Sequence, residues 1–382
     1  MKQHIYADNA ATTKLDSDAF EAMKPYLLGD YGNASQPYFF GKKAAHAIKE
    51  ARKTIAECIN ASPEEIFFTS GGTESDNWVI KCFGFSSTGI RHIVTSKIEH
   101  HAVLNACHQC EIDTGNTEIF YISNDQTGTV STDDLKNILQ HQRKAVASRE
   151  TTLVSVMFAN NEIGTIQPIK ELARIAHDND ALFHTDAVQA VGHVKIDVKD
   201  LDVDYLSASA HKFNGPKGIG FLYIRKDAPI YPLHNGGTQE NGMRAGTEDV
   251  ASIVGMAVAL KKNCEVIDEN ASNLYQLETI LLEGLNGLDF VRNGAPNHIP
   301  GNISLSFKYK DGETLLHRLD LMGICVSTGS ACDSVNTQIS HVLKAIELPE
   351  VYAKGTIRVS LSKNNSYGEI CKISEALERI LG

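Results

Sequence analysis

Residues 66–75, IFFTSGGTES, place a short apolar run directly before two glycines and a helix-like stretch. The run is typical of a buried strand, and the small residues after it let backbone N–H groups approach an anion at a helix N-terminus. Ser/Thr capping of a helix with an acidic first turn explains the same residues without a ligand. The stretch matches neither the dinucleotide nor the P-loop fingerprint. It therefore predicts a strand–turn–helix unit and leaves phosphate binding open.

Further strand-like runs alternate with segments of helical period along the first two thirds of the chain. They are residues 92–95, 118–122, 153–158, 182–184 and 205–207. Among the helical segments, Ile48, Ala51, Ile55 and Ile59 recur at a spacing that predicts one buried face. Continuous apolar strands separated by helices indicate a mostly parallel sheet covered on both faces.

The pattern changes after about residue 246. Residues 249–286 predict one long helix, and two alternating runs at 302–307 and 356–360 flank a helix near 313–321. These elements predict a small α+β domain, with the boundary inside 249–286.

Composition narrows the class of protein. The 382 residues contain 47 acidic and 36 basic side chains, so the net charge of −11 speaks against direct nucleic-acid binding. The longest apolar run, near 251–260, is far shorter than the ~20 residues that span a bilayer. The N-terminus lacks a signal-peptide pattern, and eight scattered cysteines suit reduced thiols. We expect a cytoplasmic protein without a membrane partner.

Two side chains at strand ends suit the chemistry of a cationic cofactor. Lys212 closes an apolar strand, where desolvation favours a neutral amine that can form a Schiff base, although an exposed turn lysine is the simpler reading. Asp186 also ends an apolar strand, where a carboxylate suits a protonated pyridine nitrogen or caps the next helix.

Histidines and cysteines give further candidates. His100 and His101 are adjacent in sequence, so they do not share a helix face, and we expect no metal site. One of the two imidazoles suits stacking on a planar cofactor or proton transfer. A histidine at the start of a helix explains the same residues without a function. Cys332 lies in a run of small polar residues, which favours an exposed, reactive thiol. Cys107 and Cys110 form a lone pair without the further ligands of a zinc site.

Seven motifs in fixed order resemble the cysteine desulfurases, the NifS/IscS family of pyridoxal-phosphate enzymes related to class V aminotransferases. They are residues 71–77, 99–103, 159–165, 186–189, 211–212, 244–248 and 329–332, the last in the Gly-Ser-Ala-Cys form of group I. The resemblance implies the α/β architecture of a fold type I pyridoxal-phosphate transferase with a mostly parallel seven-stranded sheet. It divides the chain into an N-terminal arm (1–15) that joins the small domain, a large cofactor domain (16–255) and a small C-terminal α+β domain (256–382) carrying the cysteine loop.

The resemblance also implies roles for single residues. The catalytic residues would be Cys332, Lys212 and His100. Pyridoxal 5'-phosphate would be bound by Gly72, Thr73, His100, Asn161, Asp186, Gln189, Ser209, His211, Lys212 and, from the other subunit of a homodimer, Thr247. The carboxylate of the substrate would be bound by Asn33, Asn161 and Arg358, and an Arg fork suits a carboxylate.

The implied reaction converts L-cysteine to L-alanine, holds the sulfur as a persulfide on Cys332 and passes it to an acceptor protein, most commonly for iron–sulfur cluster assembly. Selenocysteine lyase activity and supply of tRNA or DNA thiolation stay open, as do another pyridoxal-phosphate activity, an inactive sulfur carrier and, with no fingerprint, a nicotinamide dehydrogenase. Asp333 beside Cys332 should raise the pKa of the thiol. Because the chain ends 24 residues after Arg358, we do not expect the tail by which longer members dock their scaffold.

Overall fold

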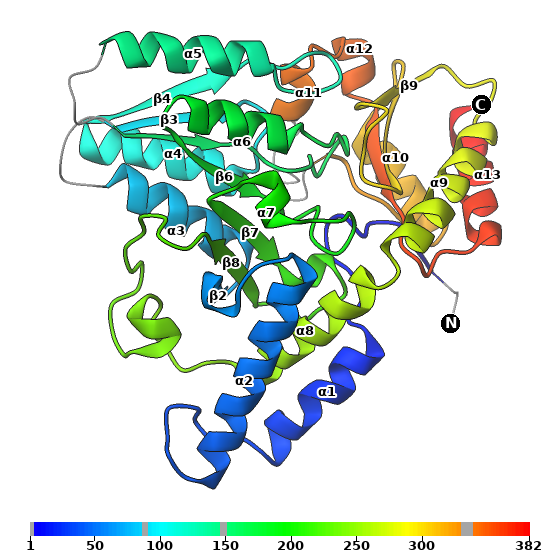
Figure 1. Ribbon diagram of the computed structural model, residues 1–382. Helices are drawn as coiled ribbons and strands as arrows, with labels where there is room; N and C mark the ends of the chain where they lie inside the picture. The colour runs from blue at the N-terminus through cyan, green and yellow to red at the C-terminus, as the bar shows by residue number, and fades with distance from the viewer. Residues whose placement is uncertain (1–3, 86–90, 146–150, 330–338) are drawn as a thin grey trace.

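The computed structural model describes residues 4–85, 91–145, 151–329 and 339–382, and its largest element is a seven-stranded sheet (Figure 1). In sheet order the strands are β2 (Ile66–Thr69), β8 (Gly220–Ile224), β7 (Tyr205–Ser209), β6 (Leu182–Asp186), β5 (Thr151–Ser155), β3 (Arg91–Ser96) and β4 (Thr117–Ile122). All neighbours run parallel except β8, which is antiparallel to both β7 and β2. The predicted mostly parallel sheet is therefore confirmed.

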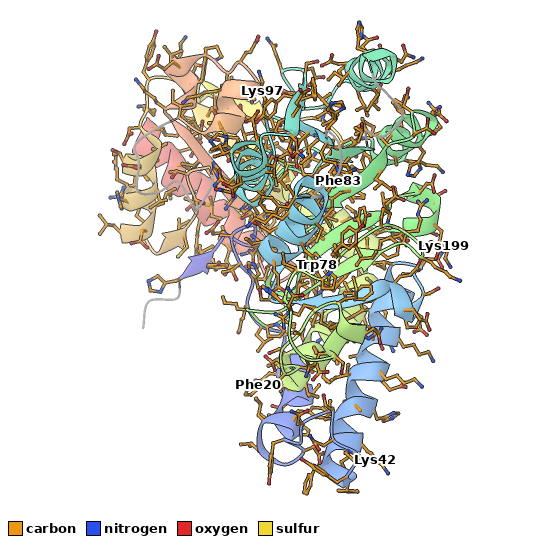
Figure 2. The ribbon with its side chains drawn as sticks, turned by 90° about the vertical axis from the view of Figure 1, so that its left-hand side faces the viewer. Phe20, Lys42, Trp78, Phe83, Lys97 and Lys199 are labelled. Carbon is orange, nitrogen blue, oxygen red and sulfur yellow. The ribbon has the colours of Figure 1, made fainter. Side chains whose placement is uncertain are left out.

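Helices cover both faces of this sheet. One face packs in a large apolar cluster against α2 (Phe39–Cys58), α6 (Ile169–Asp178) and α8 (Val250–Cys264). The opposite face packs against α3 (Gly72–Gly84) and α4 (His101–Thr114), where Trp78 is fully buried (Figure 2). The predicted helix face of Ile48 to Ile59 is confirmed, since all four side chains are at most 8% exposed.

A second apolar core lies beside the sheet. It contains the antiparallel strands β12 (Thr356–Ser360), β10 (Asn302–Phe307) and β9 (Phe290–Asn293). It is covered by α9 (Ile267–Glu283), α10 (Gly312–Leu321) and α13 (Tyr367–Leu381). The strand β1 (Ile5–Tyr6) pairs in parallel with β11 (Ile324–Cys325), so the start of the chain packs on this second core.

The remaining helices are α1 (Ser17–Leu28), α5 (Thr132–Ala145), α7 (Val198–Leu201), α11 (His341–Ala345) and α12 (Glu350–Ala353). Short 3-10 turns occupy Pro63–Glu65, Ala210–Lys212 and Gln239–Gly242. In the described ranges, no helix is long and apolar enough to cross a membrane.

Two predicted elements were wrong in extent. Residues 249–286 form α8 and α9 rather than one helix, because the chain turns at Glu265 and Val266 as it passes from the large core to the second core. The strand expected over 153–158 ends at Ser155, although the N–H groups of Val156 and Phe158 still donate to the carbonyl oxygens of His184 and Asp186 in β6. The apolar residues of both segments predict burial, but they do not indicate where the backbone changes direction or where the regular element ends.

His177, on α6, provides a test of this packing by pH. Its Nδ1 lies 2.9 Å from Asp202 and its Nε2 lies 2.8 Å from Asp204. The hydrogen bond to Asp204, followed by the charges of both carboxylates, raises the pKa of His177. Its folded pKa exceeds the unfolded value of about 6.5, so the stabilisation is complete below that pH and is lost as the pH rises through the folded pKa.

We expect the stability difference between wild type and His177→Gln, measured by urea unfolding, to shrink by up to about 1 kcal/mol between about pH 6 and pH 9. The variant carries the same background titration, so it serves as the control. A difference that stays constant over this range would contradict the assignment.

Candidate active site

A cavity of about 260 Å³ opens at the carboxyl end of the parallel strands, where ligands bind in open α/β sheets. Ten of the predicted site residues line it: Gly72, Thr73, His100, Asn161, Asp186, Gln189, Ser209, His211, Lys212 and Arg358. They come from turns that follow β2, β3, β5, β6 and β7, and from β12 of the second core. The cavity therefore exists only where the two cores meet.

One end of the cavity is the N-terminus of α3. Gly71 is the N-cap residue, with φ of +147° and no side-chain cap hydrogen bond, so the simple Ser/Thr-cap reading is wrong. Added at Gly72, a Cβ would collide with Cγ2 of Val188. The uncapped N–H groups, the helix dipole and the side chains of Thr73 and Ser209 suit a phosphate.

Lys212 lies in the cavity rather than on an exposed turn. Its Nζ donates hydrogen bonds to the carbonyl oxygens of Ala10 (2.6 Å) and Ala11 (2.9 Å). The backbone carbonyl of Lys212 also lies 2.9 Å from Nε2 of His193. The start of the chain thus forms the wall opposite the lysine, a contact that the sequence did not indicate.

Asp186 ends β6 and is 5% exposed. Its Oδ1 accepts a hydrogen bond from the N–H of Val188 at 2.9 Å, so it also forms the local turn that the sequence left open. Burial raises the pKa of Asp186, while the charges of His100 and Lys212 lower it. A buried carboxylate of this kind is stabilised by a cation.

Asp76 is a second buried carboxyl that sequence reasoning missed. It lies on α3 and lines the cavity, and its Oδ1 has no hydrogen-bond partner, although Nε2 of His184 is 3.7 Å away. Burial, followed by the charge of Asp186, raises the pKa of Asp76 well above its usual range. Burial also lowers the pKa of His184 to about 3. Burial therefore favours the neutral form of both carboxyls, and more strongly that of Asp76.

His100 is the N-cap residue of α4. Its Nδ1 accepts a hydrogen bond from the N–H of Ala102 at 3.1 Å, which leaves Nε2 for the cavity. Burial lowers the pKa of His100, although the charge of Asp186 acts in the opposite direction. Burial and the charge of Lys212 likewise lower the pKa of His211 to about 4. Both imidazoles are therefore neutral near pH 7.

Arg358 is the only arginine that lines the cavity within the described part of the chain, and it is 2% exposed. Its Nη2 donates to Oδ1 of Asp8 at 2.8 Å, and its Nη1 donates to the carbonyl oxygen of Asn161 at 2.9 Å. The remaining donor, Nε, is buried without a partner. Asp8 is a further site residue that the sequence analysis missed, because its partner is distant in sequence.

Two predicted residues do not line the cavity. Asn33 precedes α2, and Thr247 is exposed. Cys332, like Asp333 beside it, falls outside the described residues. Cys107 and Cys110 are buried on α4.

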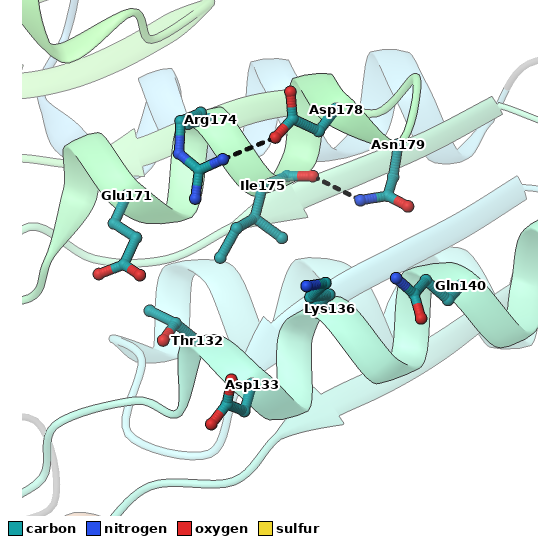
Figure 3. Close-up of a pocket in the computed structure, with 9 residues that line it drawn as sticks. All are labelled: Thr132, Asp133, Lys136, Gln140, Glu171, Arg174, Ile175, Asp178 and Asn179. Atoms are coloured by element: carbon teal, nitrogen blue, oxygen red, sulfur yellow. Dashed lines mark hydrogen bonds and ion pairs between the residues drawn. The ribbon is translucent and has the colours of Figure 1, made fainter.

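A larger groove of about 420 Å³ lies on the surface between α5 and α6 (Figure 3). Charged and polar side chains line it, among them Glu171 and the ion pair of Arg174 with Asp178 at 2.8 Å. It contains none of the predicted site residues, so the smaller cavity is the candidate active site.

The polar groups that line the cavity fit pyridoxal 5'-phosphate. The α3 N-terminus suits its phosphate, Asp186 its protonated ring nitrogen, and Lys212 its aldehyde. The close approach of Gly72 to Val188 and the buried carboxyl of Asp186 are the observations that carry this fit. Fold and cavity together define a pyridoxal-phosphate enzyme of fold type I.

Comparisons with known proteins specify the family. The "Aminotransferase class-V" family model matches residues 5–373. The chain is 48% identical to "Cysteine desulfurase IscS" of Dictyoglomus turgidum over its whole length and 95% of that protein. It is 46% identical to the protein of that name from Methanosarcina thermophila, covering 99% of this chain and 92% of the relative.

Superposition on solved structures points to the same family as the sequence comparisons. A "NifS-like protein" superposes with a TM-score of 0.90 at 37% identity over 99% of both chains. A structure described as "SspA in complex with cysteine" superposes with a TM-score of 0.80 at 34% identity, over 95% of this chain and all of that one. The chain belongs to the cysteine desulfurases of the class-V aminotransferase family.

The contact of Gly72 with Val188 predicts a compensating pair of substitutions. We expect Gly72→Ala to weaken binding of pyridoxal 5'-phosphate about 5- to 100-fold, the cost of overpacking by one methyl group. Val188→Ala in the same chain should restore most of the affinity by removing the colliding methyl groups. Fluorescence titration of the apoprotein with the cofactor measures both. If the single and double variants bind the cofactor with equal affinity, Val188 is not the side chain that the added methyl group meets.

Proposed function

We infer that this protein is a pyridoxal-phosphate-dependent cysteine desulfurase, which transfers sulfur from L-cysteine to an enzyme cysteine and releases L-alanine. The observation that carries the inference is that one cavity holds a lysine, a buried carboxylate and a buried arginine in a chain similar over its full length to cysteine desulfurases. When bound, the cofactor withdraws electrons from the α-carbon of the substrate.

The roles of the cavity residues follow from their positions. The Arg358 guanidinium binds the substrate carboxylate, with Asn161 and Asp8 holding its other N–H groups. Asp186 keeps the ring nitrogen of the cofactor protonated. The Lys212 amine and Nε2 of His100 move protons to and from the substrate. Gln189 would bind the ring hydroxyl of the cofactor, and its Nε2 donates to the carbonyl oxygen of Ala10 at 3.0 Å.

Cys332 is the proposed sulfur acceptor within the enzyme. Its thiolate attacks the sulfur of the substrate, so that the carbon–sulfur bond breaks, a sulfur–sulfur bond forms, and the electron pair stays with the carbon that becomes alanine after protonation. Support comes from the described chain just before it: Ser327 and Arg358 exchange two backbone hydrogen bonds, of 3.1 and 2.7 Å. The segment that carries Cys332 therefore starts beside the carboxylate-binding arginine.

Purified protein with L-cysteine tests this function. We expect alanine to form, to require a reductant for repeated turnover, and to leave one extra sulfur on the Cys332 peptide by mass. Cys332→Ala should keep the yellow cofactor and lose at least about 99% of turnover, whereas Lys212→Ala should lose both the absorbance and the turnover. Cys325→Ala is the control, because Cys325 lies on β11 and outside the cavity.

Other outcomes favour specific alternatives. Alanine without a persulfide on Cys332 would indicate a lyase that releases sulfide directly. No alanine despite bound cofactor, with selenide released from selenocysteine, would favour a selenocysteine lyase and contradict the proposed substrate.

We also propose a homodimer in which Thr247 reaches the phosphate in the second copy. Thr247 is exposed and outside the cavity of its own chain. Arg244, in the same loop, is anchored on Glu74 of α3 by hydrogen bonds of 2.9 and 3.1 Å, so the loop is held in place with Thr247 outward. The helices α1 and α2 and the turn between them project from the rest of the molecule (Figure 1), and they carry exposed large apolar side chains. These are Phe20, Leu27, Leu28, Tyr31, Tyr38, Phe39 and Phe40, and they suit a subunit contact.

Co-expression of Lys212→Ala and Thr247→Ala chains tests the shared site. Thr247→Ala alone should weaken cofactor binding about 10- to 100-fold, the loss of a hydrogen bond to a charged group. In the mixed dimer one site regains both native residues, so activity at limiting cofactor should return to about a quarter of wild type or more. Activity no higher than that of Thr247→Ala alone, or an active monomer in sedimentation, would contradict the proposal.

The remaining assignments are proposals of the same kind. We propose an arm 1–15, a large domain 16–255 and a small domain 256–382; the presence of two apolar cores and the β1–β11 pairing support this division, although Met256 and Leu260 of α8 pack in the large core. The seven cysteines that the structure describes are all free thiols, which supports a cytoplasmic location. The IscS names of the relatives favour an acceptor protein of iron–sulfur cluster assembly, ahead of tRNA or DNA thiolation.

A further inference from the structure

The chain between β8 and α8 runs outside the sheet as a long segment, and residues 232–249 of it form the Thr247 loop (Figure 1). Within this loop, Glu240 and Asn241 have φ of +47° and +56°, and the next residue, Gly242, has φ of +81°. Left-handed backbone is unfavourable for glutamate and persists only where the surroundings fix it. A contact from outside the loop therefore has to hold this turn.

Arg52 of α2 makes that contact. Glu240 is 7% exposed, and its carboxylate accepts two hydrogen bonds from the guanidinium of Arg52, from Nη2 to Oε1 at 2.6 Å and from Nη1 to Oε2 at 2.7 Å. Nη1 also donates to the carbonyl oxygen of Ile66, and Cζ lies 4.3 Å from the ring centroid of Phe68. A bidentate pair of this kind permits few relative orientations of the two side chains. It therefore fixes the turn against α2 and β2.

The same carboxylate caps the edge of the large sheet. β2 lies at one edge of the sheet, next to β8, and the N–H of Phe68 donates to Oε2 of Glu240 at 2.9 Å. A backbone N–H at a sheet edge has no strand to receive it and needs another acceptor. β2 leads directly into the turn at Gly71 and Gly72 that suits the phosphate. Glu240 therefore attaches the loop to the strand that builds the phosphate site of its own chain.

A hydrogen bond inside the loop connects this anchor with Thr247. Oε1 of Gln239, the residue before Glu240, accepts from the N–H of Gly246, the residue before Thr247, at 3.3 Å. The ion pair of Arg244 with α3 holds the loop at a second point. Thr247 is exposed, but the residues on its N-terminal side are attached to buried groups of the large core.

We propose that Glu240 is a positioning residue: paired with Arg52, it holds the Thr247 loop in the conformation that presents Thr247 to the phosphate site of the second copy. The proposal rests on the proposed homodimer, in which Thr247 reaches that phosphate. The carboxylate of Glu240 is buried against α2 and β2 and lies outside the cavity, so it acts through the loop. A hydroxyl that is already held in place loses little freedom on binding, so the pair should raise the affinity for the cofactor.

Two substitutions release the loop at different points. Glu240→Gln keeps the shape of the side chain and removes the charge that Arg52 binds. Gln239→Ala removes the acceptor of the hydrogen bond inside the loop and leaves the buried ion pair intact. The matched control is Glu278→Gln, the same chemical change at a glutamate on α9 that is 5% exposed and pairs with Arg292 at 2.6 Å. It removes a buried ion pair of the second core, outside the Thr247 loop.

Each substitution is combined with Thr247→Ala, and fluorescence titration of the apoprotein with pyridoxal 5'-phosphate gives the dissociation constants. We expect Glu240→Gln alone to weaken binding about tenfold. In the Glu240→Gln chain, Thr247→Ala should weaken binding further by at most about twofold, because the threonine is no longer held at the phosphate. In the Gln239→Ala chain the further effect should fall to about threefold. In the Glu278→Gln chain, Thr247→Ala should keep the full effect that it has in wild type.

Hydrogen exchange of the loop amides tests the anchor without the cofactor. We expect the amides of residues 239–247 to exchange at least about tenfold faster in Glu240→Gln than in wild type, because the turn opens more often. The same amides should exchange at the wild-type rate in Glu278→Gln. If Glu240→Gln does not fold, the titrations and exchange rates of Gln239→Ala decide, since that variant leaves no buried charge unpaired.

An undiminished effect of Thr247→Ala in the Glu240→Gln chain, or unchanged hydrogen exchange in the loop, would overturn the proposal. So would a Glu240→Gln protein that sediments as a monomer, because the weaker binding would then reflect a lost subunit contact. If Thr247→Ala does not weaken binding in the wild-type chain, the proposed shared site is wrong. Faster exchange in Glu240→Gln would in that case still show that the carboxylate holds the loop, so the two failures are distinguishable.

Discussion

The buried guanidinium of Arg358 is the contact on which the rest of the site depends. It lies on β12 of the second core, donates to Asp8 near the start of the chain, and donates to the carbonyl oxygen of Asn161 in the turn after β5. Burying a cation is costly unless every N–H finds an acceptor, so these three segments are stable together and not apart. Nε of Arg358 is the guanidinium nitrogen that is buried without a hydrogen-bond partner. The contacts that join the two cores therefore also build the wall of the cavity that Arg358 provides.

The second constraint is the burial of two carboxyl groups, those of Asp76 and Asp186, beside the same cavity. Asp76 and Asp186 are both buried and both line the cavity, and the charge of Asp186 raises the pKa of Asp76. Burial raises the pKa of both carboxyls, and at Asp186 the hydrogen bond from Val188 and the charge of Lys212 oppose this rise. A protonated ring nitrogen beside Asp186, at the end of β6, would favour the ionised form of this carboxyl.

Much of the fold could be predicted because its determinants are local. The runs at 302–307 and 356–360 became β10 and β12 with the expected bounds, since alternation and β-branched residues act over a few positions. The segment 249–286 was predicted as one helix because both halves favour helix, and the turn between α8 and α9 depends on which core each half packs against. Asp8, Asp76 and Glu240 were missed for a related reason. An isolated acidic residue is ordinary in sequence, and only its burial beside a distant partner gives it a role.

The sequence by itself determined the class of fold, the order of the strands along the chain and, through short motifs, ten residues that the structure brings to one cavity. Hydrophobic period and motif spacing carry that information because they depend on neighbours along the chain. Only the tertiary structure decided that Lys212 faces the carbonyls of Ala10 and Ala11, and that Glu240 pairs with Arg52. These pairings join residues about 190 to 200 positions apart, and burial rather than sequence proximity selects them.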